Sequence, residues 1–220
     1  MHTLLLVPTE RERLHLARQP GFGVDAPCAL CGFGPVAAAA NARHAIARHS
    51  PERVIVVGIA GTFDPVGLPI GSAAVFPAVV MHGIGVGGAS SFVSAAKLGF
   101  RHWPPPMFRD NDPDAPDQLS LNCPVPPAGG PLLTCCTASS TSTEAAERRR
   151  QFPNAVAEDM EGFGVALAGH LAGVPIAIVR GISNQVGDRE FERWQIQEAL
   201  EAAYLVATDL LGRSTWNDMA

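Results

Sequence analysis

The sequence predicts an α/β protein in which a central sheet is flanked by helices. Apolar runs typical of buried strands occur at residues 2–7, 53–57 and 176–179. Stretches with helical character, alanine-rich at 35–49 and amphipathic at 195–211, lie between and after these runs. Because 220 residues are enough to bury a substantial core in one unit, we expect a single domain over residues 1–220.

Composition and charge narrow the class of function. The formal net charge of -5 offers no basic surface to nucleic acid, and no apolar run approaches the length of a membrane span. The apolar run at residues 4–7 is too short for a signal-peptide core and leads directly into charged residues. We therefore expect a cytoplasmic protein with neither nucleic-acid nor membrane partners.

The cysteines predict neither a disulfide framework nor a metal site. Five is an odd number, which argues against the paired cysteines of a secreted scaffold. Cys28 and Cys31 form a CxxC pair, but Cys135 and Cys136 lack the spacing of metal ligands, and cysteine is often simply a small buried residue. No metal and no organic cofactor are expected.

The N-terminal half is predicted as strands alternating with helices. The first strand ends at Pro8, and Thr9 is the expected N-cap of a helix over residues 9–18. A second strand and turn over 28–34 precede the alanine-rich helix, and the strand at 53–57 ends in the Gly-Ile-Ala-Gly segment 58–61.

The middle of the chain is richer in glycine and proline. Segment 83–88 contains GxGxxG, but a dinucleotide site also needs a helix opening there and an acidic residue about twenty positions on, so we interpret it as a mobile loop. Residues 104–131 are proline-rich and aperiodic, which predicts an irregular connection. A strand over 132–137 and a helix over 144–152 follow, with Ser139 in the Ser/Thr cluster that could cap the helix.

The stretch 157–194 carries the first candidates for a site. An acidic segment leads into a helix signalled by apolar residues from Met160 to Leu171 and stopped at Gly173, and the strand at 176–179 comes next. Polar residues follow that strand at once. In open α/β sheets ligands bind beyond the carboxyl ends of strands, so Glu161, Ser183 and Asn184 are candidates. Taken singly, Glu161 could merely cap a helix and Asn184 could form a turn.

These motifs resemble those of a known superfamily. The resemblance to the purine nucleosidase and nucleoside phosphorylase superfamily rests on DMEG followed by a helix, a VPI strand and RGISN. Within that superfamily, GISNQVGDR followed by Trp194 is most similar to futalosine hydrolases, which act in an alternative menaquinone pathway. The segments GFGPVAAAANARHAIA, GIAG at 58–61 and LPIG at 68–71 extend the resemblance over most of the chain. In the family a long strand follows the turn that LPIG resembles, so the resemblance implies one long strand over residues 73–80. It implies a three-layer nucleoside phosphorylase-like fold with a twisted mixed sheet. The related methylthioadenosine/S-adenosylhomocysteine nucleosidases carry Asp where this chain has Asn184.

The resemblance also implies roles for individual residues. Glu12, at the carboxyl end of the first strand, matches the carboxylate that activates water, although Glu10 is close enough to be confused with it. Glu161 would hold the ribose hydroxyls and stabilise the positive charge that develops on the sugar. The remaining expected substrate-binding residues are Ile59, Ala60, Gly61, Ala138, Ser139, Met160, Ser183 and Arg180. For Arg180 a structural role, in which it pairs with an acid near the pocket, stays open as an alternative.

Asn184 is the residue that selects the base in this interpretation. A side-chain amide has an acceptor and a donor, so its carbonyl can accept from a protonated N7 while its NH2 donates to an oxygen at C6. A mismatched edge leaves a buried group unpaired at about 1–3 kcal/mol. Asn184, oriented by Ser183, therefore favours hypoxanthine or guanine over adenine.

The expected function is hydrolysis of futalosine to hypoxanthine and dehypoxanthine futalosine by a homo-oligomer. No arginine set for phosphate stands near Glu12, which favours water as the nucleophile. A phosphorolytic purine nucleoside phosphorylase, another 6-oxopurine nucleosidase, a non-catalytic purine-binding protein and a dinucleotide enzyme stay open as alternatives. Arg189, Arg101 and His82 are equal candidates for binding the carboxylate of the 5′ extension.

Overall fold

The computed structural model describes residues 2–103, 117–214 and 216. Its elements are β1 (Thr3–Val7), α1 (Glu10–Leu16), β2 (Cys28–Leu30), α2 (Pro35–His49), β3 (Arg53–Thr62), β4 (Ala73–Val75), β5 (Ala78–His82), β6 (Gly85–Val86), η1 (Ala89–Ser91), β7 (Val93–Ser94), β8 (Gln118–Ser120), β9 (Leu132–Cys135), α3 (Ser142–Gln151), β10 (Ala157–Asp159), α4 (Gly162–Ala172), β11 (Ile176–Gln185), η2 (Phe191–Arg193) and α5 (Ile196–Gly212). Within this part of the chain, no helix is both long enough and apolar enough to span a bilayer.

A mixed sheet forms the middle layer, as predicted. Among the described residues it has nine strands, with the path β2-β1-β3-β10-β9-β5-β8 and with β11 paired to β3 and β4. Strand β3 is the branch point, because its first half pairs with β1, its end pairs with β10, and β11 runs parallel to almost all of it. The long strands β3 and β11 therefore bring residues from distant parts of the sequence to one end of the sheet.

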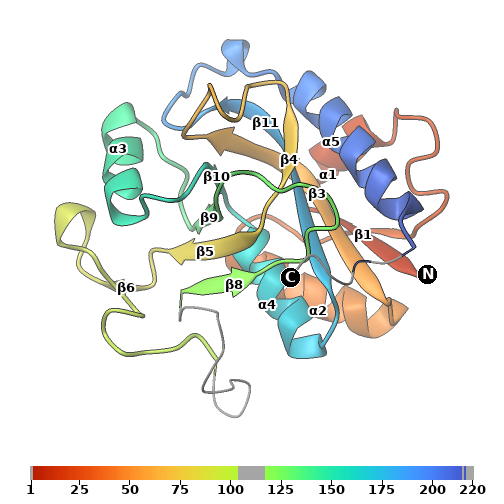
Figure 1. Cartoon of the computed structure of the whole chain (residues 1–220), viewed down its shortest axis with the longest axis horizontal. Coiled ribbons are helices and arrows are strands. Elements are labelled where there is room, and N and C mark those ends of the chain that lie inside the picture. Colours follow the sequence, from red (N-terminus) through yellow and green to blue (C-terminus); the bar gives the residue numbers. More distant parts are fainter. Residues whose placement is uncertain (1, 104–116, 215, 217–220) are drawn as a thin grey trace.

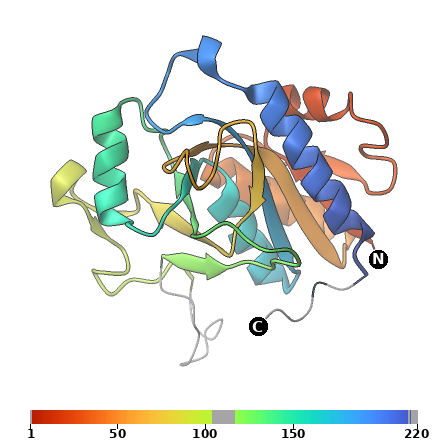
Figure 2. The ribbon, with the colours of Figure 1, turned by 45° about the horizontal axis from the view of Figure 1, so that its top comes forward.

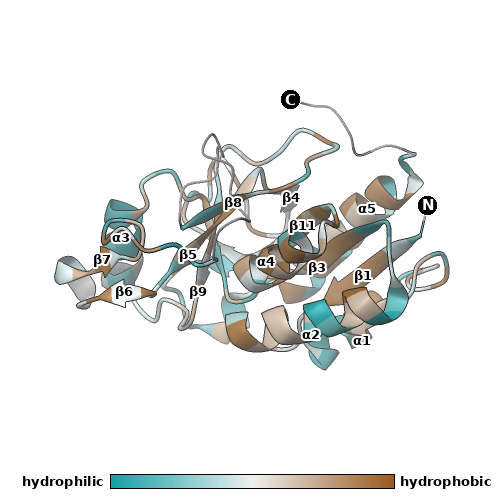
Figure 3. Cartoon of the chain, turned by 90° about the horizontal axis from the view of Figure 1, so that it is seen from below, coloured by the Kyte–Doolittle hydropathy of each residue, from teal (hydrophilic) through white to brown (hydrophobic). Residues whose placement is uncertain are grey.

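Helices cover both faces of this sheet (Figures 1 and 2). Helices α2 and α4 pack together and bury one face in an apolar cluster that includes Leu4, Ile46 and Phe163. Helices α1 and α5 cover the other face in a second cluster with Leu5 and Leu200. Figure 3 shows the result as apolar strands in the interior and a hydrophilic α3 at the edge. The predicted three-layer α/β architecture is confirmed, whereas the single-domain organisation over 1–220 stays a prediction.

The N-terminal elements largely match their predicted bounds. Thr9 is the N-cap of α1 and forms a capping box with Glu12, although the helix ends at Leu16, short of the expected residue 18. Helix α2 has its predicted bounds, with proline in its first turn and the left-handed residue Ser50 at its end. Thr141, not Ser139, supplies the side-chain cap of α3.

The long strand expected over 73–80 is wrong, because the chain changes partners there. Strand β4 pairs antiparallel with β11, and β5 pairs parallel with β9. Pro77 stands between them and has no N–H to donate to a ladder. Within the expected mobile loop at 83–88, Gly85–Val86 form β6 and pair with β7 in a small hairpin, while the mobility of the segment stays a prediction. Of the predicted irregular connection, 104–116 lie outside the described residues and 118–120 form β8.

The two elements nearest the candidate residues differ most from expectation. The acidic segment before α4 is a buried strand, β10, and α4 begins only at Gly162. Strand β11 does not stop at Val179 but continues to Gln185, so Arg180, Ser183 and Asn184 lie within it. Polar residues fit these strands because each finds a buried partner, as described below.

Candidate active site

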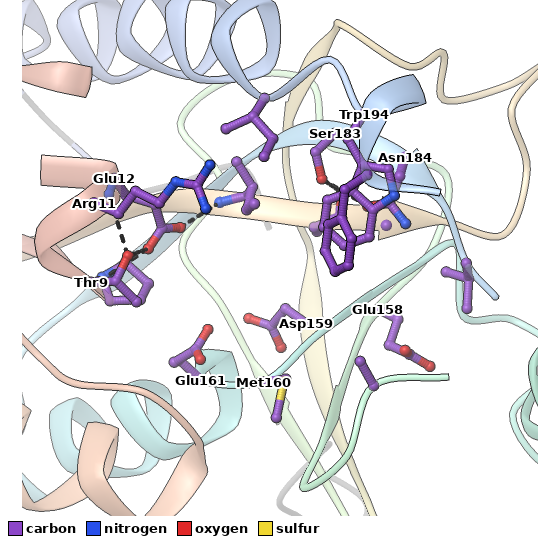
Figure 4. A pocket seen from close by; sticks show the side chains of 18 of the residues that line it. Thr9, Arg11, Glu12, Glu158, Asp159, Met160, Glu161, Ser183, Asn184 and Trp194 are labelled. Atoms are coloured by element: carbon purple, nitrogen blue, oxygen red, sulfur yellow. Dashed lines mark hydrogen bonds between the residues drawn. The ribbon is translucent and has the colours of Figure 1, made fainter. Parts of the chain in front are cut away.

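A cavity of ≈ 270 Å³ opens at the carboxyl ends of β1, β3 and β11. Its walls come from the start of α1, the end of β3, the segment before α3, the β10–α4 junction and the segment that leads into α5. Glu12 and Glu161 lie on one side, Asn184 and Trp194 lie on the other, and Met160 lies below (Figure 4). The cavity therefore has the carboxylates Glu12 and Glu161 at one end and the amide of Asn184 at the other.

Glu12 is a buried carboxylate held by main-chain and hydroxyl donors. Its Oε2 accepts from the amide of Thr9 at 3.0 Å and from Thr9 Oγ1 at 2.5 Å, and its Oε1 accepts from the amide of Ile59 at 3.0 Å. A carboxylate has about four lone-pair sites, so one on Oε1 is left for a further donor. Glu10, by contrast, is exposed, pairs with Arg13 and does not line the cavity. The geometry thus separates the two acids that the sequence left close together.

A buried cluster of charges lies beneath Glu12 and Glu161. Arg180 is fully buried, and its Nη2 donates to Asp159 Oδ2 at 2.5 Å and lies 3.5 Å from Glu161 Oε2. Asp159 in turn accepts from Thr134 Oγ1 at 2.6 Å and from the amide of Gly162 at 2.8 Å. The expected pairing of Arg180 with an acid near the pocket is confirmed. Arg180 itself is not among the lining residues, so its predicted direct contact with substrate does not fit this position.

Burial sets the protonation of Glu161. It raises the pKa of this carboxyl to about 7, while the positive charge of Arg180 opposes the rise and the negative charge of Asp159 adds to it. Although Glu161 stands at the N-cap position of α4, its side chain does not cap that helix, and Oε1 instead accepts from the amide of Gly34 at 3.1 Å. A capping role thus does not account for this acid.

Gly58 allows the acidic and basic groups to meet. A Cβ at this position would collide with Arg180 Nη1 and with Glu12 Oε1. The side chains of the first helix and of the last core strand therefore approach each other over a residue that has no side chain of its own. This is a local requirement for glycine that the sequence motif GIAG indicates but does not explain.

Asn184 is oriented by its neighbours. Ser183 Oγ donates to Asn184 Oδ1 at 2.8 Å, and Asn184 Nδ2 donates to the carbonyl of Gln185 at 2.8 Å. The orienting contact from Ser183 agrees with the sequence-based expectation. One acceptor site on Oδ1 and one N–H on Nδ2 stay unused, and the residue lines the cavity.

The wall opposite Asn184 contains an acid that the sequence did not single out. Glu158 is buried, and it accepts from the amide of Ser139 and from Ser139 Oγ, both at 2.7 Å. Arg148 Nη1 also donates to it at 2.7 Å. Six of the expected substrate-binding residues line the cavity, namely Ala138, Ser139, Met160, Ile59, Ala60 and Gly61. The Ser139 amide, however, is already committed to Glu158, which leaves it unable to donate to a base.

The mouth of the cavity is cationic and aromatic. Arg189 lines it and packs over the rings of Phe191 and Trp194, with its guanidinium carbon 5.1 Å and 5.0 Å from their centroids. The exposed Arg11 and the half-buried His15, both on α1, also line the cavity. Of the three residues considered for the 5′ carboxylate, only Arg189 lines the cavity; His82 and Arg101 do not.

Comparison with known proteins assigns the chain to a family. The phosphorylase superfamily pattern matches residues 22–212. The chain belongs to the phosphorylase superfamily. A protein named futalosine hydrolase from Streptomyces coelicolor is 34% identical over 237 residues, which cover 97% of this chain and 94% of that protein.

Two solved structures have the same fold at low sequence identity. A 5′-methylthioadenosine/S-adenosylhomocysteine nucleosidase from Colwellia psychrerythraea, in complex with adenine, superposes with a TM-score of 0.76 at 19% identity, covering 100% of this chain and 98% of the other. Futalosine hydrolase of Helicobacter pylori gives 0.73 at 16% identity, with 96% and 97% covered. At this identity these likenesses establish the fold alone.

None of the five cysteines lines the cavity, although Cys135 Sγ lies 3.8 Å from Oε2 of the lining residue Glu158. All five are free thiols, and burial raises the pKa of Cys28 to about 11 and of Cys31 to about 12. In the described part of the chain, no three His, Cys, Asp or Glu side chains are grouped so that they could hold a metal ion.

Proposed function

We propose that this protein hydrolyses the N-ribosidic bond of futalosine and releases hypoxanthine. The observation that carries the proposal is the placement of a buried carboxylate with a free lone pair, Glu12, across one cavity from an oriented amide, Asn184. The relative from Streptomyces coelicolor, named futalosine hydrolase and similar over nearly its whole length, supports the choice of substrate.

Glu12 and Glu161 have separate roles in this reaction, one toward the attacking water and one toward the sugar. Glu12 deprotonates the attacking water, a role in which a positioned general base contributes roughly a hundredfold to ten-thousandfold. Glu161 binds the ribose hydroxyls and, when ionised, stabilises the positive charge that develops on the sugar. Arg180 is a positioning residue, because its contacts with Asp159 and Glu161 hold the second acid in place.

The electrostatics of the cavity favour water over phosphate as nucleophile. The buried guanidinium of Arg180 is faced by the three carboxyl groups of Asp159, Glu161 and Glu12. A phosphate dianion near Glu12 would meet this excess of negative charge, whereas neutral water would not. Arg11 and Arg189 lie at the mouth, where they suit the carboxylate of the 5′ extension.

Purified protein in phosphate-free buffer is expected to release hypoxanthine from futalosine, faster than from inosine, and to leave methylthioadenosine uncleaved. Chromatography of the free bases measures this. Adding phosphate should leave the rate unchanged. A strict need for phosphate would identify a phosphorylase instead, and hypoxanthine binding without release of base from any nucleoside would identify a purine-binding protein.

Asn184→Asp is expected to lower kcat/KM for futalosine about tenfold to a hundredfold, because the carboxylate cannot donate to O6 of the base. The ratio of kcat/KM for the 6-oxo substrate to that for its 6-amino counterpart measures the effect. Asn154→Asp, an exposed amide outside the cavity, is the matched control. An unchanged ratio in Asn184→Asp would show that residue 184 does not read the base.

We also propose a cytoplasmic homo-oligomer. Free thiols at all five cysteines suit a reducing compartment. Phe33 and Phe191 line the cavity mouth yet are 67% and 57% exposed, and large apolar side chains gathered at one opening are typical of a surface that a second subunit covers.

A further inference from the structure

Three neighbouring strands align Glu158, Gly61 and Asn184 in one row. Gly61 of β3 pairs in register with Glu158 of β10 on one side and with Asn184 of β11 on the other. Because adjacent strands lie about 4.8 Å apart, the two outer residues stand roughly 10 Å apart across a position without a side chain. A Cβ at residue 61 would lie 3.1 Å from Val186 Cγ2 and 3.4 Å from Asn184 Nδ2. The row thus forms a slot with an acid at one end and an amide at the other.

Glu158 is held in this slot with acceptor capacity to spare. Its Oε2 accepts from Ser139 Oγ and Arg148 Nη1, both at 2.7 Å, and lies 3.8 Å from Cys135 Sγ. Its Oε1 accepts only from the Ser139 amide, at 2.7 Å. One lone pair of Oε1 is therefore unused on a side chain that is 5% exposed and lines the cavity.

The charge of Glu158 is balanced without blocking that lone pair. Arg148 approaches from α3, and its other nitrogen, Nη2, donates to Thr137 Oγ1 at 3.3 Å. The guanidinium therefore pairs with Oε2 of Glu158 and holds the side chain in place without occupying Oε1. Hydrogen bonds between a carboxylate and a guanidinium are charge-assisted and stronger than those between neutral groups.

The free groups of the slot match one kind of purine edge. Asn184 offers an acceptor and a donor, and Glu158 offers a second acceptor. A 6-oxopurine protonated at N7 presents N7–H, O6 and N1–H in succession, which is the complementary pattern. Adenine does not match. Its C6 amine would face the free N–H of Asn184, donor against donor, and its unprotonated N1 would face the free lone pair of Glu158, acceptor against acceptor.

We propose that Glu158 determines base specificity by accepting a hydrogen bond from N1–H of the 6-oxopurine. This role rests on the proposed function, because it assumes that the base occupies the Asn184 end of the cavity. The same residue also consumes the Ser139 amide, which is a donor that an unprotonated adenine N1 would need. Glu158 thus selects for hypoxanthine and against adenine at once.

Glu158→Gln is the direct test, read by the binding of free hypoxanthine and free adenine in calorimetry. Arg148 and the Ser139 amide donate to different oxygens of Glu158, whereas glutamine has only one oxygen. With that oxygen paired to Arg148, the NH2 group takes the place of Oε1 and of its free lone pair. Hypoxanthine is expected to bind about tenfold to a hundredfold more weakly, with adenine binding unchanged or tighter. Glu144→Gln is the matched control, since Glu144 accepts from Ser140 N and Oγ in the same manner but is exposed and outside the cavity.

A second measurement uses the unaltered protein, so it does not depend on whether a variant folds. The unaltered protein should bind 1-methylhypoxanthine at least about tenfold more weakly than hypoxanthine, because the methyl group removes the N1–H donor. Equal binding of these two bases, or an unchanged hypoxanthine-to-adenine ratio in folded Glu158→Gln, would overturn the proposal. If no nucleoside is cleaved while the base preference persists, the proposed hydrolysis fails and the role of Glu158 stands.

Discussion

Glu12→Gln is expected to reduce kcat for futalosine by about a hundredfold to ten-thousandfold while leaving substrate binding nearly intact. The amide cannot take a proton from water, so the variant loses the general base. Binding persists because the side chain keeps its size and an oxygen that can accept from the Ile59 amide. Single-turnover kinetics measure the loss, and calorimetry with a C-nucleoside analogue of inosine measures the binding.

The local structure limits how much of that loss could come from misfolding. Glu12 closes the capping box of α1 with Thr9, and loss of a cap typically lowers the free energy of unfolding by about 1 kcal/mol. Such a change leaves a stable protein folded, so the activity change would report chemistry. Glu10→Gln, in the same helical turn but exposed, is the control and should retain full turnover. Unchanged turnover in Glu12→Gln would move the base to another residue.

The sequence predicted most of the fold because burial and helix signals are local. Thr9 and Pro35 mark helix starts by their own chemistry, and apolar runs such as 53–57 mark strands covered on both faces. The break at Pro77 was missed because which strands pair with the two halves is a property of the sheet, not of the segment.

The candidate site was predictable only where a residue acts through its own side chain. Glu12, Asn184 and Glu161 have chemistry that a matching motif carries with it, and all three line the cavity. Glu158 was not singled out because, in the sequence, it is only one acid of the segment that leads into the predicted helix. Its significance lies in Arg148, ten residues earlier, and in the register that sets it opposite Gly61. No local pattern marks it, because β10 is only three residues long and two of them are acidic.

Glu161→Gln is expected to make the protein more stable at alkaline pH and at the same time less active. The folded protein holds the Glu161 proton up to about pH 7, whereas the ordinary pKa is 4.5. Folding therefore takes up a proton between these pH values, and the free energy of unfolding falls as the pH rises through this window. One pKa unit corresponds to about 1.4 kcal/mol, so the ionised, buried acid costs about 3 kcal/mol at pH 8.

Glutamine mimics the neutral carboxyl and can still accept from the Gly34 amide. The variant should therefore match the unaltered protein in thermal unfolding at pH 4 and exceed it at pH 8 by roughly 6–12 °C in Tm. If stability at pH 8 were unchanged or lower, the ion pair with Arg180 would outweigh the burial of the carboxylate.

Activity is expected to move in the opposite direction, because the chemistry needs the form of Glu161 that the fold disfavours. Only the ionised carboxylate opposes the positive charge of the developing ribosyl cation, so Glu161→Gln should lower kcat by roughly a hundredfold. In the unaltered protein, kcat/KM should rise with pH and level off above about 7, the pKa of Glu161. The variant should lose this rise, and a rise that persists in Glu161→Gln would assign the titration to a different group. The ionised form of Glu161 thus lowers the free energy of unfolding and is also the form that the reaction needs, which is a trade-off between stability and activity at one residue.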